Sequence, residues 1–123
     1  MQFYALAPCR VADTRDPPGP YGGPPLAGGA NRSFVLGGRC GIPATAAAVS
    51  SNFTVTQPAA PGDLRVFPGG AALPVVSTLN WSSGQTRANN AVVILGAATD
   101  LAVRCDQVAG TVQLVVDVNG YFQ

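Results

Sequence analysis

Short segments rich in β-branched and aromatic residues recur every ~10 to 15 positions, and Gly, Pro, Asn and Asp fill the gaps between them. This alternation is typical of an antiparallel all-β domain, because those four residue types end strands and form turns. No stretch repeats apolar residues with the 3.6-residue period of a helix, although the Ala run before residue 49 favours a helical turn. We expect eight strands, at residues 2–7, 32–36, 46–56, 63–67, 75–81, 86–95, 100–105 and 111–118.

Eight such strands predict an antiparallel two-layer β-sandwich or a jelly-roll-like fold. The 123 residues are enough for one domain with a single core, so residues 1–123 are interpreted as one module. Charged residues make up only 11% of the chain, against about 25% in ordinary soluble domains. A surface built mainly from neutral polar residues suits extended contacts with other chains or neutral polymers.

Two strands show clear period-two alternation, which places alternate side chains on opposite faces. One face of the third strand is expected to be buried, and it carries Val49, Ser51, Phe53 and Val55. In the last strand the apolar face carries Val112, Leu114, Val116 and Val118. Asp117 lies on the other face of a strand that reads as central, which predicts a hydrogen-bonded carboxylate.

Residues 14–31 contain five Pro and five Gly and are expected to form one long loop. Loops of this length tend to be functional or disordered. Proline lowers the ordering cost because it restricts the unfolded chain. Tyr21, in the middle of the loop, is interpreted as a packing residue, with an exposed contact as the alternative.

Arg10, Asp13, Arg15 and Asp16 fall within seven positions at the end of the first strand. Backbone groups lose their ladder partners at such a boundary, and Asp and Arg side chains can replace them. The pattern predicts a structural polar network, in which Asp117 is the partner if the terminal strands are adjacent. A ligand or ion site, or simple exposure, are the alternatives.

The chain has no His, which excludes Ser-His-Asp and Cys-His catalytic pairs and imidazole metal ligands. Its seven basic residues are scattered, so no basic stripe is present for nucleic acid. The six Asp include no pair that argues for glycoside hydrolysis, and residues 117–120 read as an Asn-Gly turn rather than a calcium site. We therefore predict no catalytic activity, no cofactor and no metal.

No apolar run reaches 18 residues and no export signal is visible, so membrane insertion is not expected. The chain is interpreted as a module excised from, or repeated in, a larger exported protein, located outside the cell or at its surface. A cytosolic protein that begins at Met1 would look the same.

The three cysteines, Cys9, Cys40 and Cys105, leave an odd count. One bridge with a free thiol, an intermolecular bond or no bridge are all compatible with it. A bridge between Cys9 and Cys40 would close about 30 residues and add roughly 3 to 4 kcal/mol in the chain-entropy model. Zinc is disfavoured because the cysteines are far apart and lack a His partner.

The stretch from residue 80 to residue 91 holds the only Trp, together with amides and hydroxyls. An indole flanked by such groups is a possible sugar-stacking platform. Glycan contacts are therefore predicted at Trp81, Asn89, Asn90 and Tyr21. The alternative for Trp81, at a strand end, is a core position.

Six segments together resemble a module of large secreted bacterial proteins that has no assigned activity. They are FYALAPCRVADTRDPPGPYGGPPLAGG, GRCGIPATAAAV, NFTVTQPAAPGDLRVFPGG, STLNW, GQTRANNAVV and VVDVNGYF. The resemblance implies that Cys9 pairs with Cys40. It also implies a polar framework of Asp13, Arg15, Asp117 and Asn119.

The first functional hypothesis is a non-catalytic extracellular module with a structural or adhesive role, which contacts neighbouring domains or copies of itself. Strand-like sequence at both ends suits tandem modules or exchanged terminal strands. The alternative is a carbohydrate-binding module that tethers a secreted protein to polysaccharide. An Asp-based hydrolase is the third.

Overall fold

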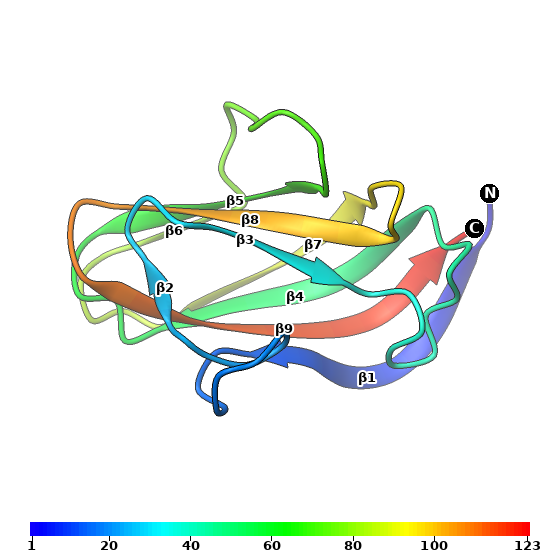
Figure 1. Cartoon of the computed structure of the whole chain (residues 1–123), viewed down its shortest axis with the longest axis horizontal. Helices are drawn as coiled ribbons and strands as arrows, with labels where there is room; N and C mark the ends of the chain where they lie inside the picture. Colours follow the sequence, from blue (N-terminus) through cyan, green and yellow to red (C-terminus); the bar gives the residue numbers. More distant parts are fainter.

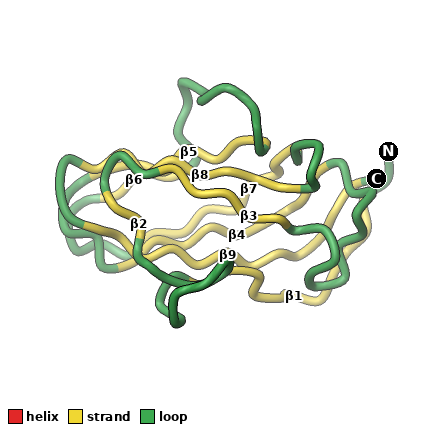
Figure 2. Tube along the Cα trace, viewed as in Figure 1, coloured by secondary structure: helices red, strands yellow, loops and turns green.

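The computed structural model describes all of residues 1–123 and contains strands and loops but no helix (Figure 2). Two antiparallel sheets face each other, which confirms the predicted all-β sandwich (Figure 1). Nine strands are present instead of eight, because a two-residue strand forms inside the long loop. The strands are β1 Phe3–Asp13, β2 Leu26–Ala27, β3 Asn31–Val35, β4 Ala48–Thr56, β5 Gly62–Pro68, β6 Leu79–Trp81, β7 Arg87–Ile94, β8 Asp100–Gln107 and β9 Thr111–Phe122.

The larger sheet has the order β1-β9-β4-β7, and β2 pairs with the beginning of β9. The smaller sheet has the order β3-β8-β5-β6. The first and last long strands of the chain are therefore neighbours, as the proposed pairing of Asp117 requires. One edge of the larger sheet is β1 and the other is β7.

The core lies between the two sheets and follows the predicted alternation. Val49, Ser51, Phe53 and Val55 of β4 are all 0% exposed. The apolar face of β9 is equally buried, and the side chains that meet it from the smaller sheet include Leu64, Leu101 and Val103. No layer of secondary structure covers the outer face of either sheet. Both outer faces are therefore available to the surroundings.

Strand β1 continues to Asp13, well past the expected end at residue 7. Pro8 does not end it, because β1 is an edge strand and its register shifts between Ala5 and Cys9. Strand β9 likewise continues through residues 119 and 120, so the predicted Asn-Gly turn is wrong. The ring of Phe3 on the adjacent strand lies over Gly120, so a side chain at this position would require that ring to move.

Two further expectations about secondary structure are wrong. The Ala run before residue 49 forms turns instead of a helix, because β4 begins at Ala48. The strand expected at residues 75–81 begins only at Leu79. The preceding residues form a loop that arches away from the sandwich above β5 (Figures 1 and 2).

The long loop after β1 is held by backbone and side-chain bonds. Asp13 N donates to Tyr21 O at 2.9 Å, and Gly23 N donates to Asp16 O at 2.9 Å. Arg32 adds two bonds from β3, to Gly19 O and Pro24 O. A loop that the sequence predicts only as irregular thus has a defined path against the edge of the sheet.

The two ends of the chain lie side by side (Figure 1). Gln2 N donates to Gln123 O at 2.7 Å, and Gln123 N donates to Gln2 O at 3.0 Å. Beside them, Phe3 and Phe122 pack with ring centroids 5.0 Å apart, and Tyr4 stacks on Tyr121 at 5.1 Å. The structure holds no helix of the length and apolarity that a membrane span requires.

Candidate functional site

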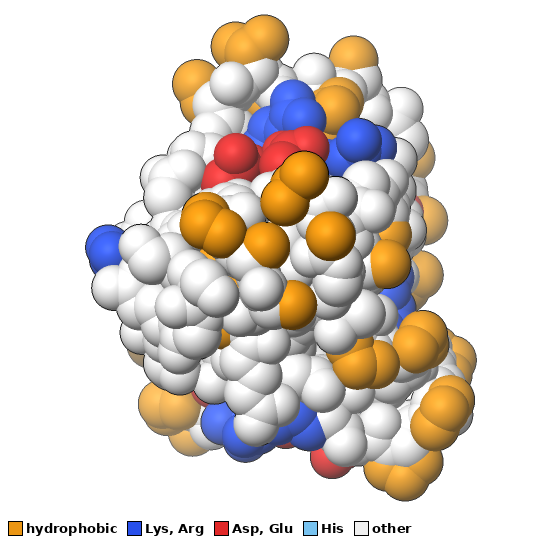
Figure 3. Space-filling model, turned by 90° about the vertical axis from the view of Figure 1, so that its left-hand side faces the viewer, with side chains coloured by type: hydrophobic (Ala, Val, Ile, Leu, Met, Phe, Trp, Pro, Cys, Tyr) orange, Lys and Arg blue, Asp and Glu red, His pale blue; other side chains and the backbone are white.

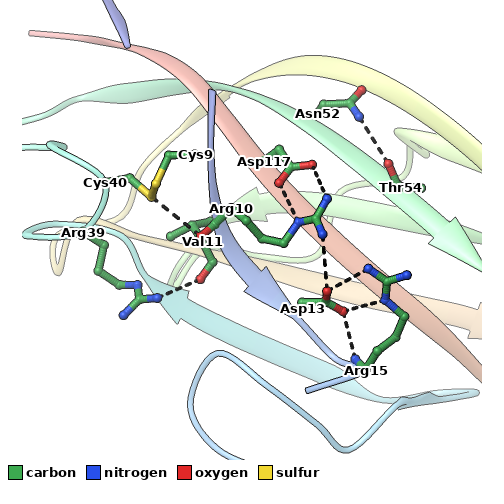
Figure 4. Close-up of polar contacts among 10 residues, drawn as sticks. All are labelled: Cys9, Arg10, Val11, Asp13, Arg15, Arg39, Cys40, Asn52, Thr54 and Asp117. Carbon is green, nitrogen blue, oxygen red and sulfur yellow. Dashed lines mark hydrogen bonds and ion pairs between the residues drawn. A yellow bond between two sulfur atoms is a disulfide. The ribbon is translucent and has the colours of Figure 1, made fainter. Parts of the chain in front are cut away.

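Arg10 and Asp117 form the centre of a polar network where β1 and β9 pair (Figure 4). The guanidinium of Arg10 donates from Nε to Asp117 Oδ1 at 2.9 Å and from Nη2 to Asp117 Oδ2 at 3.3 Å. It also lies 3.7 Å from Asp13 Oδ2 through Nη1. Arg15 forms a second fork, with Nε and Nη2 donating to the two oxygens of Asp13 at 2.9 and 2.8 Å.

Asp13 is the buried member of this network, with a side chain only 7% exposed. Besides the two Arg side chains it accepts the backbone N–H of Arg15 at 3.0 Å. The hydrogen bonds from Arg15 hold the pKa of Asp13 below its usual value, and the positive charges of Arg15 and Arg10 act in the same direction. Four charged groups therefore neutralise one another where the chain leaves the sheet.

Asn119 does not join that network. Its amide donates to Asn90 Oδ1 on β7 at 2.9 Å, and Asn90 donates to Ser50 Oγ on β4 at 3.2 Å. The predicted framework therefore separates into an ionic part over β1 and β9 and an amide part over β4, β7 and β9. The strand register places the two parts side by side on the outer face. Arg10 is the strand partner of Asp117, Asp117 is that of Asn52, and Asn52 is that of Asn90.

A hollow of about 320 Å³ adjoins the ionic network, between β1, the long loop and Arg39. Arg39 lies over the ring of Tyr21, with its guanidinium carbon 3.5 Å from the ring centroid, and donates to Val11 O at 3.2 Å. The acids and bases at the hollow are mostly paired with one another or with main chain. Asp16 and Arg39 make no ion pair, and Arg39 is bound to main chain instead.

Tyr21 serves as a packing residue. Its hydroxyl donates to Val35 O at 2.7 Å, and Arg39 covers one face of its ring. The ring also packs against the hydrophobic core. These contacts fix the middle of the long loop to the sandwich.

The stacking platform predicted at Trp81 is wrong. Trp81 is 5% exposed and belongs to the core. Its Nε1 donates to Ala60 O and to Gln107 Oε1, both at 3.1 Å. A buried indole N–H needs such partners. Because the ring itself is buried, neither of its faces is free to stack on a sugar.

Asn89 and Asn90 are both exposed on β7, but they point to different neighbours. Asn89 donates to Thr78 O at 2.9 Å, which links β7 to the start of β6. Asn90 belongs to the amide group with Asn119. The structure thus does not bring Tyr21, Trp81, Asn89 and Asn90 together into one sugar site.

Cys9 and Cys40 form a disulfide, as the resemblance implied. The bridge ties β1 to the loop after β3, and a free Cys105 is left on β8. Cys105 is 0% exposed, and its burial, together with the nearby Asp106 and Asp63, raises the pKa of its thiol to about 11. This thiol is therefore inert in the folded protein.

A second ionic cluster lies on the outer face of the smaller sheet and was not predicted. Arg65 donates from Nε and Nη2 to the two oxygens of Asp106 at 2.7 and 2.8 Å, and Arg104 approaches Asp106 at 3.3 Å. Asp63 faces Asp106 as its strand partner. The alternating charges of residues 63–65 and 104–106 were visible in the sequence, but the register that aligns them was not.

These carboxyl groups have opposite pKa shifts. Hydrogen bonds from Arg65 lower the pKa of Asp106 to about 2. Burial and the neighbouring Asp106 raise the pKa of Asp63, whose buried Oδ1 accepts no hydrogen bond.

Figure 3 shows that most charged atoms on one end of the molecule gather near its top and its bottom. Much of the remaining surface is neutral.

The free edge at β7 exposes two large apolar side chains. Val92 and Ile94 are 60% and 68% exposed, although Val93 between them is buried. Next to them, β5 and β7 border an apolar groove of about 280 Å³, lined by residues such as Val66, Pro68, Pro74 and Ile94. The sequence predicted the strand but not this exposure, because the run AVVIL reads as a buried strand.

The structure is an all-β sandwich in which four Arg and three Asp side chains form ion pairs and in which the edge strand β7 exposes Val92 and Ile94. The chain matches no protein-family model and no curated protein. The resemblance to a module of secreted bacterial proteins therefore stays a prediction.

Proposed function

We propose that this protein is a non-catalytic structural module that associates with copies of itself outside the cell. The observation that carries the proposal is the edge strand β7, which is eight residues long and has a backbone unpaired on one side. Its pairing with β4 runs without a register shift, and it contains no Pro. Long, regular and apolar edges pair readily with other chains.

The other edges carry the features that discourage such pairing. Strand β1 contains Pro8 and Arg10 and has two register shifts. Strand β6 has three residues, and β3 has five residues with Arg32 among them. Because bulges, prolines, charges and short length all block edge pairing, β7 stands out as the edge without protection.

Electrostatics supports the same function. The formal net charge is +1, and the only charged residue of β7 is Arg87 at its beginning. The two ionic clusters lie on other strands and neutralise themselves. Little repulsion therefore opposes the approach of two β7 edges, and association is expected to respond weakly to salt.

Cysteine chemistry supports the extracellular location. Disulfides such as the one between Cys9 and Cys40 persist mainly in oxidising compartments. A structural role, with no catalysis, is proposed because the Arg and Asp side chains pair internally and no His is present. The alternative of a carbohydrate-binding module loses its main support with the burial of Trp81, and we do not propose it.

The test compares two substitutions of exposed apolar residues. Ile94→Lys places a charge on the β7 edge, whereas Val108→Lys places one on the turn between β8 and β9, where Val108 is 90% exposed. Sedimentation velocity over a concentration series should show association for the native protein and for Val108→Lys but not for Ile94→Lys. Equal association of the two variants would exclude the β7 edge as the contact.

A further inference from the structure

The loop between β5 and β6, residues 69–78, is the most exposed apolar segment of the chain. Val75 is 96% exposed, Val76 is 68% exposed and Leu73 is 40% exposed. The loop contains no charged residue. It arches away from the sheet above β5 (Figures 1 and 2). Such a contiguous apolar segment marks an interaction surface.

The sequence of this loop favours a strand that the single chain does not form. Residues 75–81 carry the β-branched pattern from which a strand is expected, yet only Leu79–Trp81 pairs with β5. Val75 and Val76 are strong strand formers without a strand partner. Both residues therefore favour a strand but lie in a loop, and pairing with a strand of another molecule would satisfy that preference.

The loop is held on both sides of Val75 and Val76. Arg65 Nη1 donates to Pro74 O at 2.9 Å, and Thr78 N donates to Leu64 O at 2.8 Å. Asn89 on β7 also donates to Thr78 O. An apolar tip on a fixed base is already oriented before binding, which lowers the ordering cost of a contact.

The groove between β5 and β7 has matching chemistry. Nine residues line it, six of them hydrophobic and none charged. Residues 91–94 form its β7 wall, and Pro74 and Thr78 of the loop itself lie at its border. The groove therefore adjoins both an unpaired strand edge and the loop. An apolar strand segment fits this combination, since main-chain bonds to the edge supply affinity and the groove receives side chains.

We infer that the segment Leu73–Val76 of one copy binds the β5–β7 groove of a second copy. Val75 and Val76 pair with its β7 edge, whereas Pro74 has no N–H to donate and stays outside the ladder. The inference rests on the proposed self-association and identifies the segment that β7 receives. Loop and groove adjoin in one copy, so a twofold axis lets two copies exchange loops reciprocally. The smallest product is then a dimer.

The decisive experiment mixes two variants that are each defective in one half of the contact. The loop variant carries Val75→Asp and Val76→Asp, and the groove variant carries Val92→Asp and Ile94→Asp. Val108→Asp is the matched control at another exposed valine. All substituted side chains are exposed, so circular dichroism and thermal unfolding should show native folds.

We expect each defective variant alone to stay monomeric at concentrations at least tenfold above those at which the native protein and the control associate. An equimolar mixture of the two should associate again, although more weakly than the native protein. The mixed dimer has one native contact, between the loop of the groove variant and the groove of the loop variant, and one contact in which both halves are substituted. A fluorescent label on one variant reports this by sedimentation velocity.

Three results would overturn the inference. If the loop variant alone associates like the native protein while the groove variant does not, β7 edges pair without the loop, and the proposed function survives. If the mixture stays monomeric, the two halves do not bind each other. If the native protein itself is monomeric at every concentration, the inference and the proposed function both fail.

Discussion

Arg10 and Asp117 are separated by 107 positions in the chain and joined by two parallel hydrogen bonds across β1 and β9. The side chain of Arg10 is 53% exposed and that of Asp117 is 28% exposed, so water is excluded from neither. The pair thus links the two terminal strands next to Asp13 and Arg15, where the long loop begins. The geometry assigns these groups to the scaffold.

Replacing Asp117 should lower stability modestly. Asp117→Asn keeps the shape but removes the charge that Arg10 contacts, and partly exposed ion pairs contribute about 0.2 to 1 kcal/mol. We expect the free energy of unfolding in urea to fall by about that amount. Asp16→Asn is the control, since Asp16 is exposed and makes no ion pair. If Asp117→Asn and Asp16→Asn lose the same free energy of unfolding, the ion pair between Arg10 and Asp117 does not stabilise the fold.

Acidification should destabilise the fold between pH about 4 and about 2. Arg65 lowers the pKa of Asp106 to about 2, and Arg15 lowers that of Asp13. The unfolded chain binds protons to these groups at higher pH, near the ordinary Asp pKa of about 3.9. The stabilisation is therefore complete above that value and is lost as pH falls through the folded pKa. The melting temperature measured against pH should fall more shallowly in Asp106→Asn.

Asp63 should destabilise the fold as pH rises, which is opposite to the effect of Asp106 and Asp13. Its pKa is raised by burial and by Asp106, so the folded protein binds this proton more tightly than the unfolded chain. Its contribution is then fully present below the ordinary Asp pKa and is lost as pH rises through the raised one. Asp63→Asn carries no ionisable group and should raise the melting temperature at neutral pH more than at pH 4. A decrease at neutral pH would contradict the assigned protonation.

Removing the disulfide should cost more than any single ion pair. Cys9 and Cys40 are 31 positions apart, and the chain-entropy model gives roughly 3 to 4 kcal/mol for a loop of that size. We expect the double variant Cys9→Ala, Cys40→Ala to lose about that much free energy of unfolding. The native protein in reductant should match the double variant, and reductant should leave the variant itself unchanged.

Cys105 should resist thiol reagents while the protein is folded. The side chain is fully buried, and its raised pKa of about 11 leaves almost no thiolate at neutral pH. Mass spectrometry should detect no alkylation in buffer and one added group in denaturant. Rapid labelling in buffer would show that β8 opens locally.

Much of the scaffold could be predicted because local pattern and tertiary environment agree. The alternation in β4 placed Phe53 and Val55 correctly in the core, and the position of Asp117 opposite an apolar face indicated a paired carboxylate. The disulfide was implied only by resemblance, since three cysteines allow several states.

The remainder depends on contacts between distant residues. Trp81 at a strand end reads as a platform or a core residue, and only its bonds to Ala60 and Gln107 decide between them. An Asn-Gly pair reads as a turn until Phe3 of another strand occupies the space over Gly120. Val92 and Ile94 are exposed because they point to the uncovered outer face of the edge strand β7, whereas Val93 points into the core, and sequence does not specify which face is covered.

The dependence of molecular mass on protein concentration is the direct test of self-association. Sedimentation equilibrium of the native protein should show a mass that rises with concentration and changes little between low and molar salt. A single monomer mass over the whole range would contradict a self-associating module, and strong dissociation by salt would contradict an uncharged contact.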